Sequence, residues 1–135
     1  MNKVLSEKAR AFLQERRGAV LGTINRDGSP QQSAIWYQLL EDDSILICTQ
    51  AGRVKERNLR RDPRASICFE DGAYVTITGK AILIDDPKQA QQNLYRIVVR
   101  YRGEEAAPKY VEERLQQGRV VTIHVQPDNI IESFW

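Results

Sequence analysis

Positively charged side chains are concentrated in one short stretch of the sequence, residues 53–64 (RVKERNLRRDPR). This stretch has a net charge of +4, whereas the whole 135-residue chain has a net charge of only +2. Such a concentration indicates either a site that binds an anion or a helix with a solvated outer face. The basic residues are Arg53, Lys55, Arg57, Arg60, Arg61 and Arg64.

The beginning of the basic stretch has the features of a phosphate site. Gly52 follows the apolar run 44–50, which is typical of a strand, and a helix is predicted to begin at about Arg53. Backbone N–H groups and the helix dipole favour an anion at such a position. Arg53 could add a two-pronged guanidinium contact and Lys55 a point charge. Together these features favour a phosphate site over a solvated face.

Few other residue types in the chain could do chemistry. There is one histidine, and the two cysteines, Cys48 and Cys68, form no CxxC pattern with each other, so no metal site is predicted. His124 lies in a β-branched run, where a structural or surface imidazole is the usual case. No catalytic residue can be identified. If the protein is an enzyme, a cofactor must therefore supply most of the chemistry.

The same composition disfavours several partners and locations. No aromatic residue lies between Tyr37 and Phe69, and the net charge is small, so nucleic acid is not an expected partner. No apolar run is long enough for a membrane span, and the N-terminal residues lack a signal-peptide core. We expect a cytoplasmic protein with no membrane association, whose two cysteines are buried free thiols rather than a disulfide.

The elements that would position the basic stretch are mostly short strands. Ser6 is predicted to cap a helix over residues 6–17, and Pro87 and Pro108 open two further helices that end at glycines. Short turns between successive strands predict an antiparallel arrangement rather than βαβ units. The chain is thus expected to be one domain, residues 1–135, mainly β with peripheral helices around a small barrel of about six strands. The predicted strands are residues 19–25, 30–40, 44–50, 64–70, 73–84, 119–127 and 129–135.

Three segments together resemble the pyridoxamine 5′-phosphate oxidase-like split barrels. They are DGSPQQSAIWYQL (27–39), ILICTQAGRVKERNLRRDPRASI (45–67) and YVTITGKAILI (74–84), in the order and spacing of that superfamily. The segment RVKERNLRRDPRAS (53–66) is similar to the signature of the subgroup that uses the deazaflavin coenzyme F(420) in place of FMN. The resemblance covers about residues 5–135.

This resemblance implies a six-stranded antiparallel split β-barrel (the FMN-binding split barrel) that forms a homodimer, with two cofactor sites at the subunit interface. Arg53 and Lys55 match the cations that hold the cofactor phosphate. Asn58 matches an asparagine that supports the adjoining loop or the cofactor. The partner subunit would cover the other side with residues 132–135 and the region of Tyr74. The full implied cofactor-binding set is Pro30, Gln31, Ser33, Thr49, Gln50, Arg53, Val54, Lys55 and Asn58.

Within this set, each group of residues has an implied position. Thr49, Gln50 and the backbone near Val54 match the strand-to-helix turn beside the phosphate. Pro30, Gln31 and Ser33 match residues of the second strand that lie against the ring system. Gln31 and Ser33 are two residues apart, so they share one strand face and could form a polar row there.

The function that the resemblance implies is hydride transfer from reduced F(420) to an unsaturated small-molecule acceptor of the quinone, enone or tetrapyrrole type. Two alternatives stay open: an FMN-dependent oxidoreductase of the same superfamily, and a non-catalytic carrier of a flavin or tetrapyrrole. Asp62 is expected to pair locally while Pro63 ends the helix. The arginines that could screen the acidic tail of F(420), or simply form solvated faces, are Arg57, Arg60, Arg96, Arg100 and Arg102.

Overall fold

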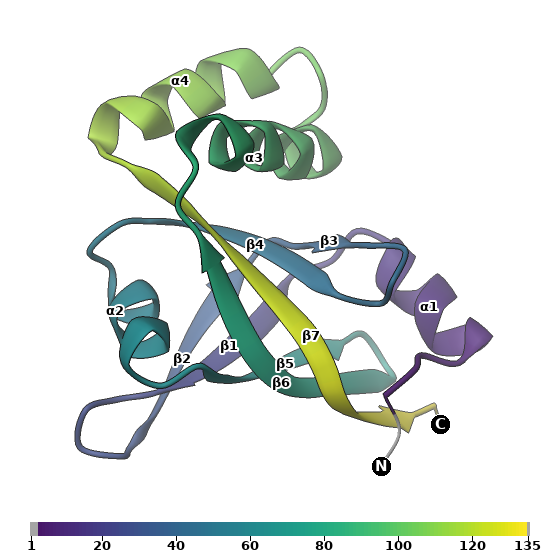
Figure 1. The fold of residues 1–135 in the computed structure, drawn as a ribbon. Coiled ribbons are helices and arrows are strands. Elements are labelled where there is room, and N and C mark those ends of the chain that lie inside the picture. The colour runs from purple at the N-terminus through teal and green to yellow at the C-terminus, as the bar shows by residue number, and fades with distance from the viewer. Residues whose placement is uncertain (1–2, 135) are drawn as a thin grey trace.

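A computed structural model describes residues 3–134, which form four helices and seven strands. The barrel-like sheet has α1 and α2 on opposite sides, and the α3–α4 pair stands beyond one end (Figure 1). The helices are α1 (Glu7–Gln14), α2 (Val54–Arg61), α3 (Pro87–Arg102) and α4 (Ala107–Gln117). The strands are β1 (Ala19–Ile24), β2 (Pro30–Ile35), β3 (Gln38–Leu39), β4 (Ile45–Gln50), β5 (Arg64–Glu70), β6 (Tyr74–Ile84) and β7 (Val120–Ser133).

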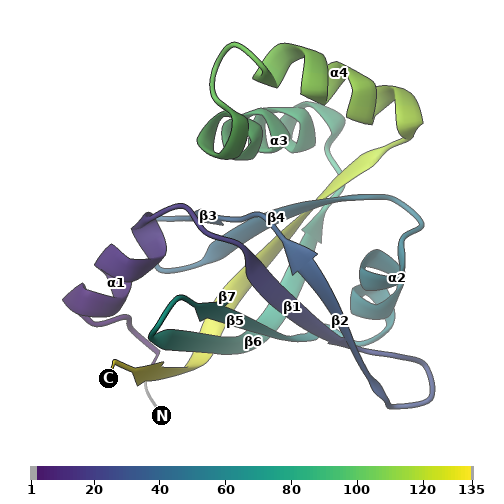
Figure 2. The same cartoon turned by 180° about the vertical axis from the view of Figure 1, so that it is seen from behind.

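All seven strands belong to one sheet with the order β2-β1-β5-β6-β7-β4-β3, in which every neighbouring pair is antiparallel. The two edge strands, β2 and β3, are separated in sequence only by Trp36 and Tyr37. The sheet must therefore curl until its edges come near each other, and the curl is visible from both sides (Figures 1 and 2). Closure of this kind removes exposed strand edges. The predicted mainly-β split barrel is confirmed.

The described chain has seven strands rather than the six that the resemblance implies, and two strand boundaries differ from the prediction. The predicted strand over 30–40 is interrupted at Trp36 and Tyr37, because the chain leaves its partner β1 there and joins β4 as β3. The predicted strands 119–127 and 129–135 are instead one strand, β7, over its described part. The β6–β7 ladder continues past Pro127 through an irregularity opposite Thr78 and Gly79. A bulge of this kind tolerates a proline, which cannot donate a ladder hydrogen bond.

Most sequence signals at the helix ends are confirmed, although the first helix ends at Gln14 and not at the predicted residue 17. The Ser6 hydroxyl accepts a hydrogen bond from the Ala9 N–H, at 3.0 Å, and caps α1. Asp86 caps α3, where Pro87 is the first residue, and glycines follow the last residues of α3 and α4. α2 ends at Arg61, two residues before Pro63. None of the helices within residues 3–134 is long and apolar enough to cross a membrane.

Two hydrophobic clusters fix the layers around the site. The first fills the barrel, where Tyr37 and Phe69 are its largest members and are both fully buried. The second lies between α3, α4 and the beginning of β7, and includes Leu94, Val111 and Val120. Partly buried Trp36 and Cys48 pack against this second cluster. The helical pair is therefore packed onto the outer face of the barrel next to β4.

The two cysteines differ from the expectation that both are buried. Cys48 is half-buried, and Cys68 is exposed. The neighbours of Cys68 on β5, Ile67 and Phe69, are both fully buried in the barrel core. Because side chains alternate along a strand, Cys68 must point outward. Both thiols are free, as expected.

Candidate functional site

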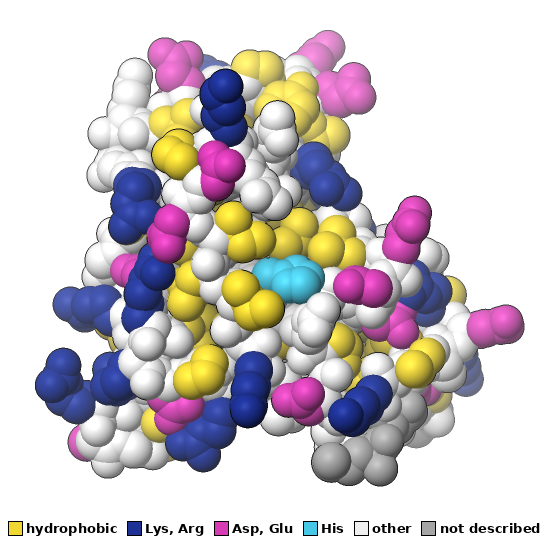
Figure 3. Space-filling view, viewed as in Figure 1, with side chains coloured by type: hydrophobic (Ala, Val, Ile, Leu, Met, Phe, Trp, Pro, Cys, Tyr) yellow, Lys and Arg dark blue, Asp and Glu magenta, His cyan; other side chains and the backbone are white. Residues whose placement is uncertain are grey.

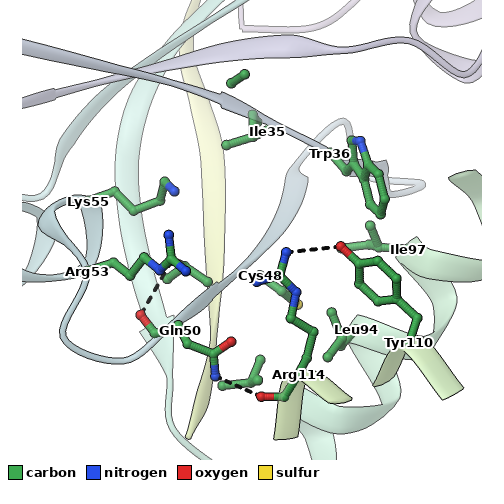
Figure 4. Close-up of a pocket in the computed structure, with 13 residues that line it drawn as sticks. Ile35, Trp36, Cys48, Gln50, Arg53, Lys55, Leu94, Ile97, Tyr110 and Arg114 are labelled. Carbon is green, nitrogen blue, oxygen red and sulfur yellow. Dashed lines mark hydrogen bonds between the residues drawn. The ribbon is translucent and has the colours of Figure 1, made fainter. Parts of the chain in front are cut away.

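A cavity of about 340 Å³ lies between the beginning of α2, strands β2 and β4, and the α3–α4 pair (Figure 4). Trp36 and Tyr110 form an aromatic part of the lining with the Arg114 guanidinium beside Tyr110, and the cations Arg53 and Lys55 lie at the start of α2. None of the described residues that line the cavity is acidic. The lining consists of Ala34, Ile35, Trp36, Cys48, Thr49, Gln50, Arg53, Lys55, Leu94, Ile97, Tyr110, Arg114 and Val120.

The turn from β4 into α2 presents backbone N–H groups beside Arg53 and Lys55. Gly52 has a φ of 90°, a left-handed conformation that glycine adopts without strain. Arg53 is the N-cap residue of α2, and its side chain makes no capping hydrogen bond. The Glu56 carboxylate instead accepts a hydrogen bond from the Gly52 N–H at 2.9 Å and holds the turn. The first turn of α2 is therefore a suitable place for an external anion.

The cations of the cavity are not neutralised by the protein. Within residues 3–134, neither Arg53, Lys55 nor Arg114 forms an ion pair. Desolvation lowers the pKa of the Lys55 ammonium, and the nearby Arg53 and Arg114 lower it further. Each of these causes disfavours the charged form of Lys55. A bound anion would offset the repulsion between Lys55 and the two arginines. These unpaired cations therefore favour the binding of a negatively charged ligand.

Arg114 is a cavity residue that the sequence reasoning missed. It comes from α4, and its guanidinium donates a hydrogen bond to the Tyr110 hydroxyl at 3.0 Å. The four-residue spacing of Tyr110 and Arg114 shows that they share a helix face. Nothing in the sequence indicates that this face meets the basic stretch, because the meeting depends on how α4 packs.

The structure brings four of the nine predicted cofactor-binding residues to the cavity: Thr49, Gln50, Arg53 and Lys55. Val54 is the first residue of α2, beside the cavity, with its side chain 41% exposed. Its predicted role concerns the backbone at the helix start, and the structure places that backbone next to Arg53 and Lys55. These five residues form one continuous strand-to-helix turn.

The second-strand residues Pro30, Gln31 and Ser33 do not line the cavity. Gln31 pairs with Thr23 and Ser33 with Leu21, and both β1 partners are buried. Directly opposed residues point to the same side of a sheet, so Gln31 and Ser33 face the interior side of the barrel. Both Ala34 and Ile35 at the end of β2 line the cavity, and Ile35 shares the interior face with Gln31 and Ser33. The end of β2 therefore borders the cavity, whereas the predicted polar row does not line it.

Asn58 is buried below the helix start rather than exposed in the cavity. Its side-chain amide donates hydrogen bonds to the Thr23 hydroxyl at 3.1 Å and to the Asn25 side-chain carbonyl at 3.0 Å. Arg61 in turn donates to the Asn58 side-chain oxygen at 3.0 Å. These contacts tie α2 to the end of β1. The geometry fits the loop-supporting alternative of its two implied roles.

Several outer arginines are engaged within the protein. Arg60 pairs with Glu56 on its own helix and with Asp85 beyond β6. Arg100 donates to the backbone carbonyls of Leu13 and Glu15 at the end of α1. Arg102 lies over the Trp36 ring, with 5.2 Å between the guanidinium carbon and the ring centroid. Arg57 is exposed and forms no ion pair within the described residues. The expected local pairing of Asp62 is confirmed, because Arg64 contacts its carboxylate at 2.7 Å.

The aromatic part of the lining is a rigid wall. Trp36 stacks on Tyr101, with ring centroids 4.8 Å apart and planes 5° from parallel, and its centroid lies 5.6 Å from that of Tyr110. Burial raises the pKa of the neighbouring Cys48 thiol to about 12. That thiol stays protonated at neutral pH and is no activated nucleophile.

His124 lies outside this cavity. Its Nε2 atom is 2.8 Å from the Ser44 hydroxyl, which donates to the Asp42 carboxylate. Within residues 3–134, no three His, Cys, Asp or Glu side chains form a group that could hold a metal ion. The cationic and aromatic lining of the cavity is of the kind that suits an anion attached to an apolar or aromatic body.

Known proteins resemble this chain over most of its length. The profile of the family described as "Pyridoxamine 5′-phosphate oxidase" matches residues 5–131. An F420H(2)-dependent biliverdin reductase of Mycobacterium tuberculosis (strain CDC 1551 / Oshkosh) is 31% identical over 119 residues, 87% of each chain.

Solved structures share the fold. The conserved hypothetical protein Rv2991 from Mycobacterium tuberculosis matches with a TM-score of 0.82 and 29% identity, over 97% of this chain and 86% of that one. A structure described as an F420 reductase matches with a TM-score of 0.79 over 94% of this chain and 98% of the other, at 21% identity. At that identity the second likeness shows the fold alone.

Proposed function

The chain belongs to the pyridoxamine 5′-phosphate oxidase family, and we propose that it is an oxidoreductase that uses coenzyme F(420) to reduce an unsaturated small molecule. The observation that carries the proposal is the cavity, whose described lining has no acidic residue and has Arg53 and Lys55 at the start of α2 and Arg114 beside an aromatic wall. Such a site suits a ligand with a phosphate at one end and a flat ring system at the other.

The residues present fit the cofactor. Arg53, Lys55 and the first-turn N–H groups of α2 would hold its phosphate, which would relieve the repulsion that lowers the pKa of Lys55. The apolar side chains Ile35, Leu94 and Ile97 would flank the ring and exclude water. When bound, the reduced cofactor supplies the hydride. The protein's part is binding and orientation, which agrees with the absence of a nucleophile or paired carboxylates from the described lining.

Support for F(420) over FMN comes from two sources. The segment 53–66 is similar to the signature of the F(420)-dependent subgroup, and the 31%-identical relative is named an F420H(2)-dependent enzyme. Both cofactors present a ribityl phosphate to the same cations, so the cavity itself accommodates either. Binding titrations with F(420) and with FMN therefore distinguish the two cofactors.

For the acceptor, we propose a conjugated tetrapyrrole, with biliverdin as the first compound to test. The aromatic wall of Trp36 and Tyr110 suits a conjugated body. The biliverdin reductase relative supports the same choice. Quinones and enones are the other acceptor classes to screen.

We also propose that two copies form a homodimer with the cavity at the interface. On the outer face of the sheet, paired residues place Ala34, Val20, Cys68, Thr76 and Ile131 in one row across five strands. Val20 is 38% exposed and Ile131 50%. The row begins at cavity-lining Ala34. A second copy that covers this row would also reach the cavity.

A further exposed apolar residue lies on the outer side of the sheet. Ile82 is 56% exposed and pairs with His124 on the outer side of β6 and β7. Figure 3 shows hydrophobic side chains gathered around the single histidine on this side of the molecule. Apolar groups gathered on one surface are typical of a contact with another chain. Tyr74 and residues 132–134 are the proposed partner contributions, and Trp135 lies outside the described residues.

The test is a pair of fluorescence titrations of the cofactor-free protein, with F(420) and with FMN, followed by turnover assays. The proposal predicts tighter binding of F(420), and oxidation of reduced F(420) that depends on biliverdin or another acceptor. Tighter binding of FMN would transfer the protein to the flavin-dependent branch. Tight binding without turnover of any acceptor would favour the carrier alternative, and binding of neither cofactor would contradict the oxidoreductase.

A further inference from the structure

We propose that Arg114 is a third cation of the phosphate site and that Gln50 positions it, an inference that rests on the proposed function. Arg114 is carried by α4, 64 residues after Gln50 in the sequence. The sequence reasoning assigned Gln50 to cofactor contact and did not consider Arg114. In the structure, Arg114 lines the cavity, and the Gln50 side chain forms a hydrogen bond with the backbone carbonyl of Arg114.

The Arg114 guanidinium points into the same cavity as Arg53 and Lys55 (Figure 4). It donates a hydrogen bond to the Tyr110 hydroxyl at 3.0 Å, and its central carbon is 5.3 Å from the Tyr110 ring centroid. A tyrosine hydroxyl does not neutralise the positive charge. A guanidinium has five N–H donors, so donors remain that can bind an anion.

Arg114 also acts electrostatically on the cations of α2. Together with desolvation and Arg53, it lowers the pKa of Lys55. The only other titratable side chains that line the described cavity are Cys48, whose high pKa keeps it neutral, and Tyr110. The unfavourable interaction between like charges is relieved when an anion binds among them. Arg114 therefore belongs to one cation cluster with Arg53 and Lys55, although it comes from another helix.

Gln50 connects the end of α4 to the phosphate turn. Its side-chain amide donates hydrogen bonds to the backbone carbonyls of Arg114 at 3.1 Å and Gly118 at 2.8 Å (the first is drawn in Figure 4). The next residue, Ala51, donates its N–H to the Arg119 carbonyl at 2.8 Å. Carbonyls in the last turn of a helix have no partner within the helix. The Gln50 amide supplies that partner and holds Arg114 beside the turn.

Because its amide nitrogen is bonded to α4, Gln50 is a positioning residue that acts through Arg114. The turn from β4 into α2 (residues 50–53) and the end of α4 are then held together by these hydrogen bonds as a single unit. The cations of α2 and α4 converge in the cavity because this unit fixes their separation. The site therefore depends on a contact between two elements that are distant in the sequence.

The first test compares Arg114→Gln with the matched control Lys109→Gln. Each substitution removes one positive charge from α4, but Lys109 is exposed and does not line the cavity. Binding of F(420) and of FMN is measured by fluorescence titration, and thermal unfolding confirms that both variants are folded. Arg114→Gln is expected to weaken the tighter-bound cofactor about 10- to 100-fold, the loss of one charged hydrogen bond. Lys109→Gln should change the affinity less than about 2-fold.

The second test separates positioning from direct contact. Gln50→Leu is measured alone and in the Arg114→Gln background. If Gln50 acts through Arg114, its substitution weakens binding in the unmodified protein and has little further effect when Arg114 is already absent. Equal effects in both backgrounds would show that Gln50 contacts the ligand directly, and would overturn the positioning role.

The third test measures how cofactor affinity depends on pH. Replacing Arg114 would not change this dependence if the residue only stabilised the structure. In Arg114→Gln the pKa of Lys55 should rise toward its ordinary value, because one of its repulsive neighbours is gone. The pH at which cofactor affinity falls on the alkaline side should therefore move upward. An unchanged pH profile together with unchanged affinity would overturn the assignment of Arg114.

The failures of this inference and of the proposed function are distinguishable. If the unmodified protein binds F(420) or FMN and Arg114→Gln binds it equally well, only this inference is wrong. If the unmodified protein binds neither cofactor, both are wrong. Arg114→Lys keeps the positive charge but not the planar guanidinium group. It should bind the cofactor more tightly than Arg114→Gln but more weakly than the unmodified protein.

Discussion

Lys55 carries a charge that its surroundings disfavour. Desolvation is the main cause, and the two arginines nearby add to it, so the pKa of Lys55 lies below the ordinary 10.5. Between the folded and unfolded pKa values, the unfolded chain binds more protons than the folded one. The contribution of Lys55 to the free energy of unfolding therefore rises with pH in that window, while below it the charge destabilises the cofactor-free protein.

We predict that Lys55→Met stabilises the cofactor-free protein slightly at neutral pH, by less than about 1 kcal/mol because the side chain is only half-buried. The rise of stability with pH below 10.5 should shrink in this variant. Urea unfolding at several pH values measures both effects, with Lys109→Met as the exposed control. A loss of stability at neutral pH equal to that of an ordinary core truncation would contradict this account of Lys55.

In the cofactor-bound protein, the charged form of Lys55 is favoured rather than disfavoured. A phosphate favours charged Lys55, so cofactor affinity should be constant at lower pH and decrease as the pH rises through the lowered pKa of this residue. In Lys55→Met the affinity should be weaker throughout and lack this decrease. Titrations across the same pH range would show it, and a decrease retained in Lys55→Met would assign the titration to another group.

At the scale of elements, local signals in the sequence were sufficient wherever a few neighbouring residues determine the structure. The Ser6 cap, the Asp86–Pro87 helix start and the turn from β4 into α2 were all predicted, because cap and turn geometry depends on adjacent residues. The cations Arg53 and Lys55 were found for the same reason.

Features that depend on distant contacts were not predicted from the sequence. The break at Trp36 and Tyr37 arises because the chain changes strand partner, which no local pattern records. The register of β2 against β1 decides that Gln31 faces the barrel interior, and spacing alone could not choose the face. Arg114 reaches the cavity only through the packing of α4. The sequence thus predicted the turn from β4 into α2 but not the α4 side of the cavity.

One element, the β6–β7 bulge, requires a glycine. A Cβ atom on Gly79 would lie 1.9 Å from the Gln126 carbonyl oxygen, a backbone atom that cannot move aside alone. We predict that Gly79→Ala lowers the free energy of unfolding by about 1–3 kcal/mol, as overpacking does elsewhere. Gly18→Ala, where no atom lies within 4 Å of the added carbon, is the control. Equal urea midpoints for the two variants would contradict the close approach.

At the scale of the whole molecule, the outer face of the sheet carries the proposed dimer contact. We predict that Ile82→Asp converts the homodimer to monomers, because it places a charge among exposed apolar residues that the contact would bury. Leu115→Asp, which alters a 37%-exposed apolar side chain on α4, should leave the dimer intact. Sedimentation measures the mass against the 15.5 kDa of one chain. A monomeric unmodified protein would contradict the proposed interface.

The most direct test of the central claim, that the start of α2 holds a cofactor phosphate, is one affinity comparison. F(420) is titrated into the unmodified protein and into the Arg53→Ala, Lys55→Ala double variant, with fluorescence as the signal. Each charged contact contributes about 1.5–3 kcal/mol, so the double variant should bind at least about 100-fold more weakly while its thermal unfolding midpoint stays nearly the same. Equal affinity in the two folded proteins would contradict the phosphate site and the function derived from it.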